Sequence, residues 1–248
     1  RKGNYNQALD HFQQSLIIAR HIEDKHAIAI SLDKCGSVYY AWGNYEKRLE
    51  ISVETHKVYK ELNDKSGLNN YYNWRSLIYN KMGNYSKALE FNHLYMNMSM
   101  ELESYSNVAN ALHVKGMIYV LQGEYNKAAE SLEKSLSFQK ESGMNQIKLE
   151  TTITLYIIYK KLGKTYDIKE IHSLMKQTDN IKFDTNYELY QLLEDVTYLE
   201  TSYNQLNEMA EEMEANLKSK FLNYPVPKEI LEEWKKYNES FIALAAID

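Results

Sequence analysis

Cysteine, proline and glycine are all scarce in this sequence of 248 residues, which contains one, two and nine of them. The single cysteine, Cys35, cannot form a disulfide within the chain, which favours a reducing compartment and a cytoplasmic location. So few prolines and glycines exclude collagen-like, proline-rich and low-complexity chains. No apolar run approaches the roughly 20 residues that cross a bilayer, so we expect no membrane association.

Charge clusters and catalytic motifs are lacking as well. With 44% hydrophobic residues and a net charge of -5, the chain is predicted to be globular rather than disordered. Its Lys and Arg residues form no stripe that would neutralise a row of phosphates, so nucleic acid is not an expected partner. Gly163-Lys164-Thr165 resembles the end of a phosphate-binding loop, but Ile158 stands where that loop needs glycine. No histidine or cysteine spacing is typical of a zinc site. We therefore expect no enzyme activity, no cofactor and no metal.

The sequence does contain an internal repeat with a period of 40 residues. Each copy has a glycine at a turn, and a tyrosine stands 36 residues after each of the first four glycines. A period of this length indicates stacked supersecondary units. The glycines are Gly3, Gly43, Gly83, Gly123 and, in a weaker copy, Gly163; the tyrosines are Tyr39, Tyr79, Tyr119 and Tyr159.

Helical spacing surrounds each of these markers. Leu32, Gly36 and Tyr39 are four and then three residues apart, so they share one face of a helix. The small residue lets a neighbouring helix approach closely, while the tyrosine supplies apolar area and a hydroxyl group. A second helix follows the glycine turn, with small inward residues such as Ala88 and Ala128. Each unit therefore has a first helix before the turn and a second helix after it.

This pattern resembles the tetratricopeptide repeat, in its longer, 40-residue variety. It is complete at Gly116, Tyr119, Gly123, Tyr125 and Ala128. The resemblance implies an all-α fold, a right-handed superhelix of tetratricopeptide-like helix pairs (an alpha-alpha solenoid). We expect helical repeats over residues 1–180, with the first unit truncated and the fifth degenerate, and capping helices over residues 181–248. Arg48 in the second unit and Ile168 in the fifth depart from the pattern, because the remaining second helices carry alanine at that position.

The two ends of the chain carry separate predictions. Residue 1 falls at the turn inside a unit, so Leu9, Phe12 and Leu16 lack the helix that should cover them. We expect either a longer protein or a homodimer through this exposed N-terminal helix. At the other end, a helical rhythm over residues 187–213 predicts one or two helices. Pro227 then suits the first turn of a short helix that ends near Trp234.

The resemblance also implies that the first helices line a concave groove that holds a peptide or a partner's segment. Asparagine suits such a groove because its amide both donates and accepts hydrogen bonds. Family members that grip a terminal carboxylate carry a Lys/Arg and Asn clamp at these positions, whereas this chain has Asp33 and His113, so that ligand class is disfavoured. The predicted groove residues are Asp33, Tyr40, Asn70, Asn73, Asn80, Asn110, His113 and Met117. The alternative interpretation is that the asparagines are solvated polar residues.

Apolar residues, among them Met117, Ile153 and Ile157, replace polar ones in the later first helices. We expect a cover there, either a partner segment or the C-terminal helix with Ile230 and Trp234. The predicted function is a non-catalytic scaffold for protein or peptide binding. The last 50 residues or so, Tyr198–Tyr203 and Lys220–Trp234 above all, are similar to the tail of repeat regions in bacterial signalling proteins. The alternative is therefore a C-terminal regulatory arm of a larger nucleotide cyclase or ATPase.

Overall fold

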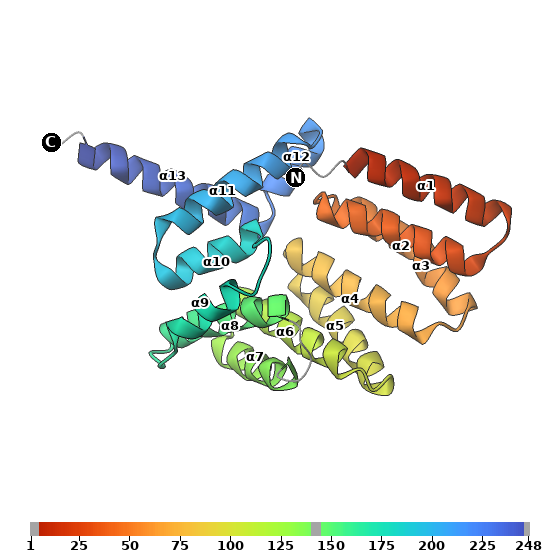
Figure 1. Cartoon of the computed structure of the whole chain (residues 1–248), viewed down its shortest axis with the longest axis horizontal. Helices are drawn as coiled ribbons and strands as arrows, with labels where there is room; N and C mark the ends of the chain where they lie inside the picture. The colour runs from red at the N-terminus through yellow and green to blue at the C-terminus, as the bar shows by residue number, and fades with distance from the viewer. Residues whose placement is uncertain (1–4, 140–144, 246–248) are drawn as a thin grey trace. The chain divides into compact units, whose positions relative to one another are not determined.

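The computed structural model describes residues 5–139 and 145–245, and every regular element in these two ranges is a helix. Helices follow one another through short turns, as Figure 1 shows. Their bounds are α1 (Tyr5–His21), α2 (Lys25–Ala41), α3 (Tyr45–Glu61), α4 (Lys65–Lys81), α5 (Tyr85–Glu101), α6 (Tyr105–Leu121), α7 (Tyr125–Gln139), α8 (Asn145–Lys161), α9 (Ile168–Met175), α10 (Phe183–Leu193), α11 (Val196–Glu211), α12 (Ala215–Leu222) and α13 (Pro225–Ala245). The expected all-α fold of tandem helix pairs is confirmed.

Two kinds of turn alternate along the repeats. The turn within a pair contains the predicted glycine, and the backbone there is left-handed: φ is 73° at Gly43, 77° at Gly83, 76° at Gly123 and 67° at Gly163. The turn between pairs uses a non-glycine residue with positive φ, namely Glu23, Asn63 and Glu103, again 40 residues apart. The sequence pattern had identified the first kind of turn but not the second.

Side-chain caps start the helices that follow these turns. Asp24 accepts a hydrogen bond from the amide of Ala27, and Asp64 accepts one from Gly67 in the next repeat. Asn44 and Asn84 cap α3 and α5 in the same way. Each cap satisfies one of the amide groups that a helix N-terminus leaves without a partner. The repeat therefore fixes where helices begin as well as where they end.

The chain divides into two compact units, residues 1–104 and 105–248, hereafter unit 1 and unit 2. Unit 1 contains α1 and the pairs α2/α3 and α4/α5. Unit 2 contains the pairs α6/α7 and α8/α9, followed by α10 to α13. The predicted boundary at residue 180, between the repeats and the capping helices, lies inside unit 2.

Small residues bring the two helices of a pair together, as expected. A Cβ atom added at Gly116 would lie 2.6 Å from the side chain of Leu132 on α7. At the equivalent position of the second pair, the hydroxyl group of Ser76 donates to the backbone oxygen of Ala88 at 2.9 Å. Close approach thus rests on a missing side chain in one pair and on a buried hydrogen bond in the other.

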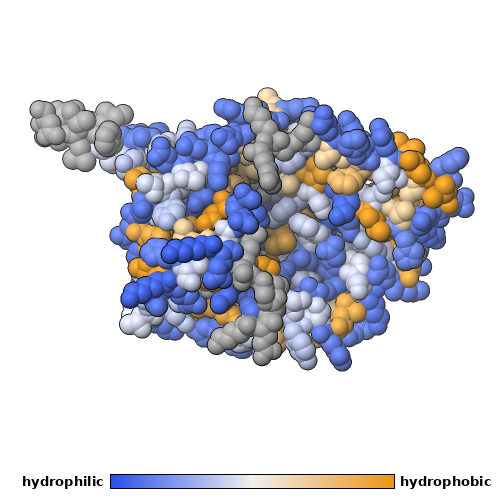
Figure 2. All heavy atoms as spheres, viewed as in Figure 1, coloured by the Kyte–Doolittle hydropathy of each residue, from blue (hydrophilic) through white to orange (hydrophobic). Residues whose placement is uncertain are grey.

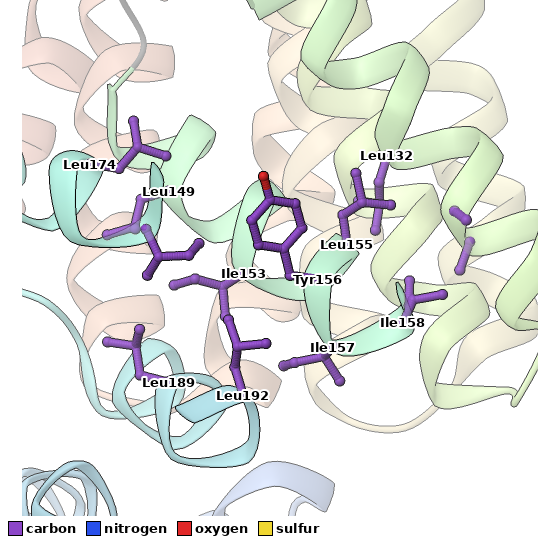
Figure 3. Close-up of a cluster of buried hydrophobic side chains, with 13 residues drawn as sticks. Leu132, Leu149, Ile153, Leu155, Tyr156, Ile157, Ile158, Leu174, Leu189 and Leu192 are labelled. Atoms are coloured by element: carbon purple, nitrogen blue, oxygen red, sulfur yellow. The ribbon is translucent and has the colours of Figure 1, made fainter. Parts of the chain in front are cut away.

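The core of unit 2 centres on α8. Every residue from 151 to 158 is buried, which is typical of a helix with neighbours on all sides. Figure 3 shows Ile153 and Ile157 pointing toward Leu189 and Leu192 of α10. The expectation that the C-terminal helix covers this apolar surface was wrong. The chain does supply a cover, but that cover is α10, which packs directly on α8.

The C-terminal helix also differs from its prediction. It begins at Pro225, two residues earlier than expected, and continues to Ala245 rather than ending near Trp234. Its residue Trp234 stacks on Tyr203 of α11 with 4.9 Å between ring centroids, and Ile230 is fully buried. This helix therefore packs mainly on α11, within the capping region, and not on a first helix.

The N-terminal helix α1 carries apolar residues on its surface. Leu9, Phe12 and Leu16 are half-buried because α1 packs on α2, the first helix of the next pair. Ile17 and Ile18 instead remain 67% and 62% exposed. Figure 2 shows hydrophobic residues gathered over the end of unit 1 where α1 meets α2. The prediction that α1 exposes apolar side chains therefore holds for Ile17 and Ile18, and not for the three residues that were named.

Candidate functional site

The first helices of unit 1, α2 and α4, form one surface. The amide group of Asn70 lies 3.4 Å from an oxygen of Asp33, and the rings of Tyr40 and Trp74 meet edge to face at 4.8 Å. The first contact joins residues that are 37 positions apart in the sequence, and the second joins residues that are 34 positions apart. We name this surface the unit 1 face; it consists of Ile30, Asp33, Ser37 and Tyr40 on α2 with Asn70, Asn73, Trp74, Leu77 and Asn80 on α4.

Asp33 lies at the centre of the unit 1 face, and its carboxylate is fully engaged within the protein. Arg48 donates to one carboxylate oxygen at 3.1 Å, while the hydroxyl group of Tyr59 and the amide group of Asn70 donate to the other. Burial, followed by the hydrogen bond to Asp33, raises the pKa of Tyr59 well above its ordinary value. The phenol therefore stays protonated and serves as a donor. Asp33 ties α2 to both α3 and α4.

Arg48 is the part of this site that the sequence reasoning missed. It belongs to the second helix α3, yet its side chain lies against Gly36 of α2, where a Cβ atom would overlap the guanidinium group. Only 1% of Arg48 is exposed, and the guanidinium carbon lies 5.3 Å from the ring centroid of Trp74. The sequence did contain a sign of this contact: Gly36 and Arg48 stand at the repeat positions that hold Ser76 and Ala88 one repeat later.

The guanidinium group of Arg48 is incompletely satisfied. Its Nη2 bonds to Asp33, but Nε and Nη1 have no hydrogen-bond partner among the described residues. Burial lowers the pKa of Arg48, and the neighbouring Asp33 charge opposes that shift. A buried charge of this kind is stable only when it is paired, so the ion pair with Asp33 is essential to the local structure.

The remaining predicted residues of unit 1 differ in exposure. Asn70 is exposed and Asn73 is half-buried, so both lie where a ligand can reach them. Asn80 is buried, and its side-chain oxygen has no hydrogen-bond partner in the described structure. Ile30, which was not among the predicted site residues, is 58% exposed. The equivalent residues of the other repeats are polar: Asn70, Asn110 and Glu150.

Among the predicted residues of unit 2, His113 is committed to the core. It is 4% exposed, and its Nδ1 lies 2.9 Å from the hydroxyl oxygen of Thr151. That hydroxyl group donates to the backbone oxygen of Ile147 at 2.6 Å, so Nδ1 of His113 is the donor. Gln139 adds a further hydrogen bond to Thr151 at 3.2 Å. These bonds link α6, α7 and α8.

Asn110 and Met117, the other predicted residues of unit 2, lie half-buried on α6. On α8, the following first helix, Ile153 is completely buried and Ile157 is 7% exposed beneath α10. The apolar first-helix residues Ile153 and Ile157, which were expected to need a cover, are thus part of the interior of unit 2. Reachable first-helix positions are concentrated in unit 1.

The described residues contain no group of three His, Cys, Asp or Glu side chains that could hold a metal ion. Cys35 is buried, and burial raises the pKa of its thiol, which is typical of an unreactive core cysteine. In the same described part of the chain, no helix combines the length and hydropathy needed to cross a membrane.

The tetratricopeptide repeat family model matches residues 1–61 and 68–141, which together exceed half of the chain. The chain therefore belongs to the tetratricopeptide repeat family, as its repeat pattern had indicated. Proteins built from these repeats generally act as scaffolds for protein interactions, and the fold is typically non-catalytic.

One solved structure similar to this chain is that of BtubC (BKLC) from P. vanneervenii. The match has a TM-score of 0.55 and covers 97% of this chain and 93% of the other, at 14% sequence identity. At that identity the likeness supports the helical repeat fold alone. No curated protein matches the sequence.

Proposed function

We propose that this chain is a non-catalytic scaffold whose unit 1 face binds a peptide or an extended segment of a partner protein. The observation that carries the proposal is the continuity of this face across α2 and α4, through the Asp33–Asn70 and Tyr40–Trp74 contacts. A ligand that crosses both helices meets exposed and half-exposed side chains at each step. The ion pair between Asp33 and Arg48 joins α2 to α3 beneath this face.

The other predicted residues are proposed in the same role within their own units. Asn73 extends the site along α4, where Asn80 is buried, and Asn110 and Met117 on α6 form a proposed contact surface of unit 2 itself. His113 contributes by holding α6 against α8 through Thr151, rather than through an exposed ring. We also propose the cytoplasm as the location and signalling as the context, on the basis of the single buried cysteine and the resemblance of the tail.

A site-specific cross-linking experiment tests this function. A photoreactive amino acid at position 70, on the unit 1 face, should capture a discrete protein from a lysate of the source cells. The matched control carries the same group at position 90, which is exposed on the second helix α5. The captured protein is then purified, and its affinity is measured for the native chain and for Asn70→Ala. Equal affinity for both chains, or equal capture from positions 70 and 90, would contradict the proposal.

The homodimer expected through the N-terminal helix is a separate proposal, favoured by the exposed Ile17 and Ile18. Sedimentation equilibrium of the native chain should give a dimer mass that Ile18→Asp reduces to that of a monomer. A native chain that sediments as a monomer would exclude this association.

A further inference from the structure

We infer that the unit 1 face selects an uncharged, extended peptide segment that carries aliphatic or proline side chains. This inference rests on the proposed function, and it names the chemistry of the ligand. Three features of the face support it: the cancellation of its charges, the exposed apolar and aromatic side chains, and the placement of its amide groups.

The charges of the unit 1 face cancel within the protein. Among the nine residues of the face, Asp33 is the one that carries a charge at neutral pH, and it is paired with Arg48. A basic ligand finds both carboxylate oxygens occupied by donors from Arg48, Tyr59 and Asn70. An acidic ligand meets the Asp33 charge first, since Arg48 lies buried against Gly36 and near Trp74. Neither sign of charge has a free counter-ion here.

Apolar and aromatic side chains lie around this neutral centre. Ile30 is 58% exposed on α2, one turn from Asp33. Tyr40 and Trp74 are half-buried and meet edge to face, and the cation of Arg48 near the indole holds that ring in place. Aromatic surfaces of this kind bind proline-rich and aliphatic segments, because such segments are pre-extended and bury apolar area at small entropic cost.

Amide groups complete the recognition of a backbone. Asn70 is exposed, and its side-chain oxygen can accept a hydrogen bond from the main chain of a ligand, while its second amide hydrogen can donate one to that main chain. Adjacent helix axes lie ~8–10 Å apart, and an extended chain advances ~3.3 Å per residue. Side chains of the ligand that contact α2 and α4 are therefore spaced about three residues apart.

Three synthetic peptides of ten residues, with acetylated and amidated ends, test the inference. The first has leucine and proline three positions apart in a serine and glycine background, the second has glutamate at those two positions, and the third has lysine. A chain with Trp42→Phe and Trp234→Phe keeps Trp74 as its one tryptophan, so its fluorescence reports on the face. We expect the neutral peptide to bind at least 10-fold more tightly than either charged peptide.

Two variants separate the charge argument from general damage. Asp33→Asn removes the negative charge that an acidic ligand meets first, and it should raise the affinity for the glutamate peptide at least 10-fold. The control Glu50→Gln makes the same change of charge at an exposed residue of α3 that pairs with Lys47, and it should change nothing. If Asp33→Asn does not fold, Ile30→Asn replaces an exposed residue and should weaken binding of the neutral peptide at least 5-fold.

The outcomes distinguish this inference from the function on which it rests. Tighter binding of a charged peptide to the native chain would overturn the ligand class and leave the scaffold function standing. Binding of the neutral peptide that is unaffected by Ile30→Asn would place the site elsewhere and overturn the inference. Failure of all three peptides, together with the absence of a cross-link from position 70, would overturn the function itself.

Discussion

The first helices of unit 1 and unit 2 differ in how much of their surface is exposed. In unit 1 the first helices keep Ile30 and Asn70 exposed above a buried ion pair between Asp33 and Arg48. In unit 2 the first helix α8 buries Ile153 beneath α10 of the same chain. The difference teaches that the surface of a first helix becomes exposed or part of the core according to what the chain places over it, and not according to the repeat pattern.

The largest expected effect of a mutation falls on the covered face of unit 2. Ile153→Ala removes a fully buried side chain between α8 and α10, so the free energy of unfolding should fall by about 2–5 kcal/mol. Ile30→Ala is the matched substitution on the open face of unit 1, and it should change stability by less than about 0.5 kcal/mol. Urea denaturation of both variants measures the contrast. Equal losses would mean that Ile30 is covered as well.

The next effect concerns the fit between Gly36 and Arg48. Gly36→Ala places a methyl group against the buried guanidinium group, so it should destabilise the chain by about 1–3 kcal/mol. The double variant with Arg48→Ala removes this overlap, and the cost of Gly36→Ala should nearly vanish in that background. A double-mutant cycle by thermal or urea denaturation measures the coupling. Additive effects of the two substitutions would show that the two side chains do not meet.

Acid should weaken unit 1 through His56. This ring stacks on Tyr71 at 4.4 Å, its Nε2 is buried without a partner, and burial, followed by the charges of Lys60 and Arg75, lowers its pKa. The unfolded chain therefore takes up the proton first. Stability from the neutral ring is present above the ordinary histidine pKa of about 6.5, and it is lost as the pH falls through the lowered value. Comparing the native chain with His56→Phe in urea, near neutrality and in mild acid, isolates this dependence; equal slopes would refute it.

The smallest effect belongs to the repeated surface ion pairs. Lys25 and Glu61 pair at 2.7 Å, and Lys65 pairs with Glu101 one repeat later. These side chains are substantially exposed, so Lys25→Ala should cost less than about 1 kcal/mol and less still at high salt. Thermal melting at low and high ionic strength checks the expectation. A larger loss that persists at high salt would point to packing by the Lys25 stem.

Much of the fold was predictable because its determinants are local. The glycine turns, the small residue on each first helix and the small inward residue of each second helix all recur in the sequence. The candidate site was predicted only in part. Asn70 and Asn73 are reachable as expected, whereas His113 and Asn80 are buried. The burial of His113 depends on a hydrogen bond to Thr151, a residue 38 positions away on another helix.

The residues that were missed share one physical reason. Arg48 was seen in the sequence as an exception to a small-residue column, but its use depends on the space that Gly36 leaves and on the carboxylate of Asp33. Likewise, the apolar character of Ile153 and Ile157 predicted a cover without revealing that α10 supplies it. Both outcomes depend on which surfaces meet in three dimensions.

The sequence by itself therefore determined the family, the helix pairs and the places where they turn, since backbone conformation and helical periodicity act over a few residues. The tertiary structure alone decided which first-helix surface stays open, where the buried arginine finds its counter-ion and which helix closes unit 2. Those decisions come from packing and from charge pairing between distant residues. The same repeat pattern is therefore compatible with an open face in unit 1 and a closed one in unit 2.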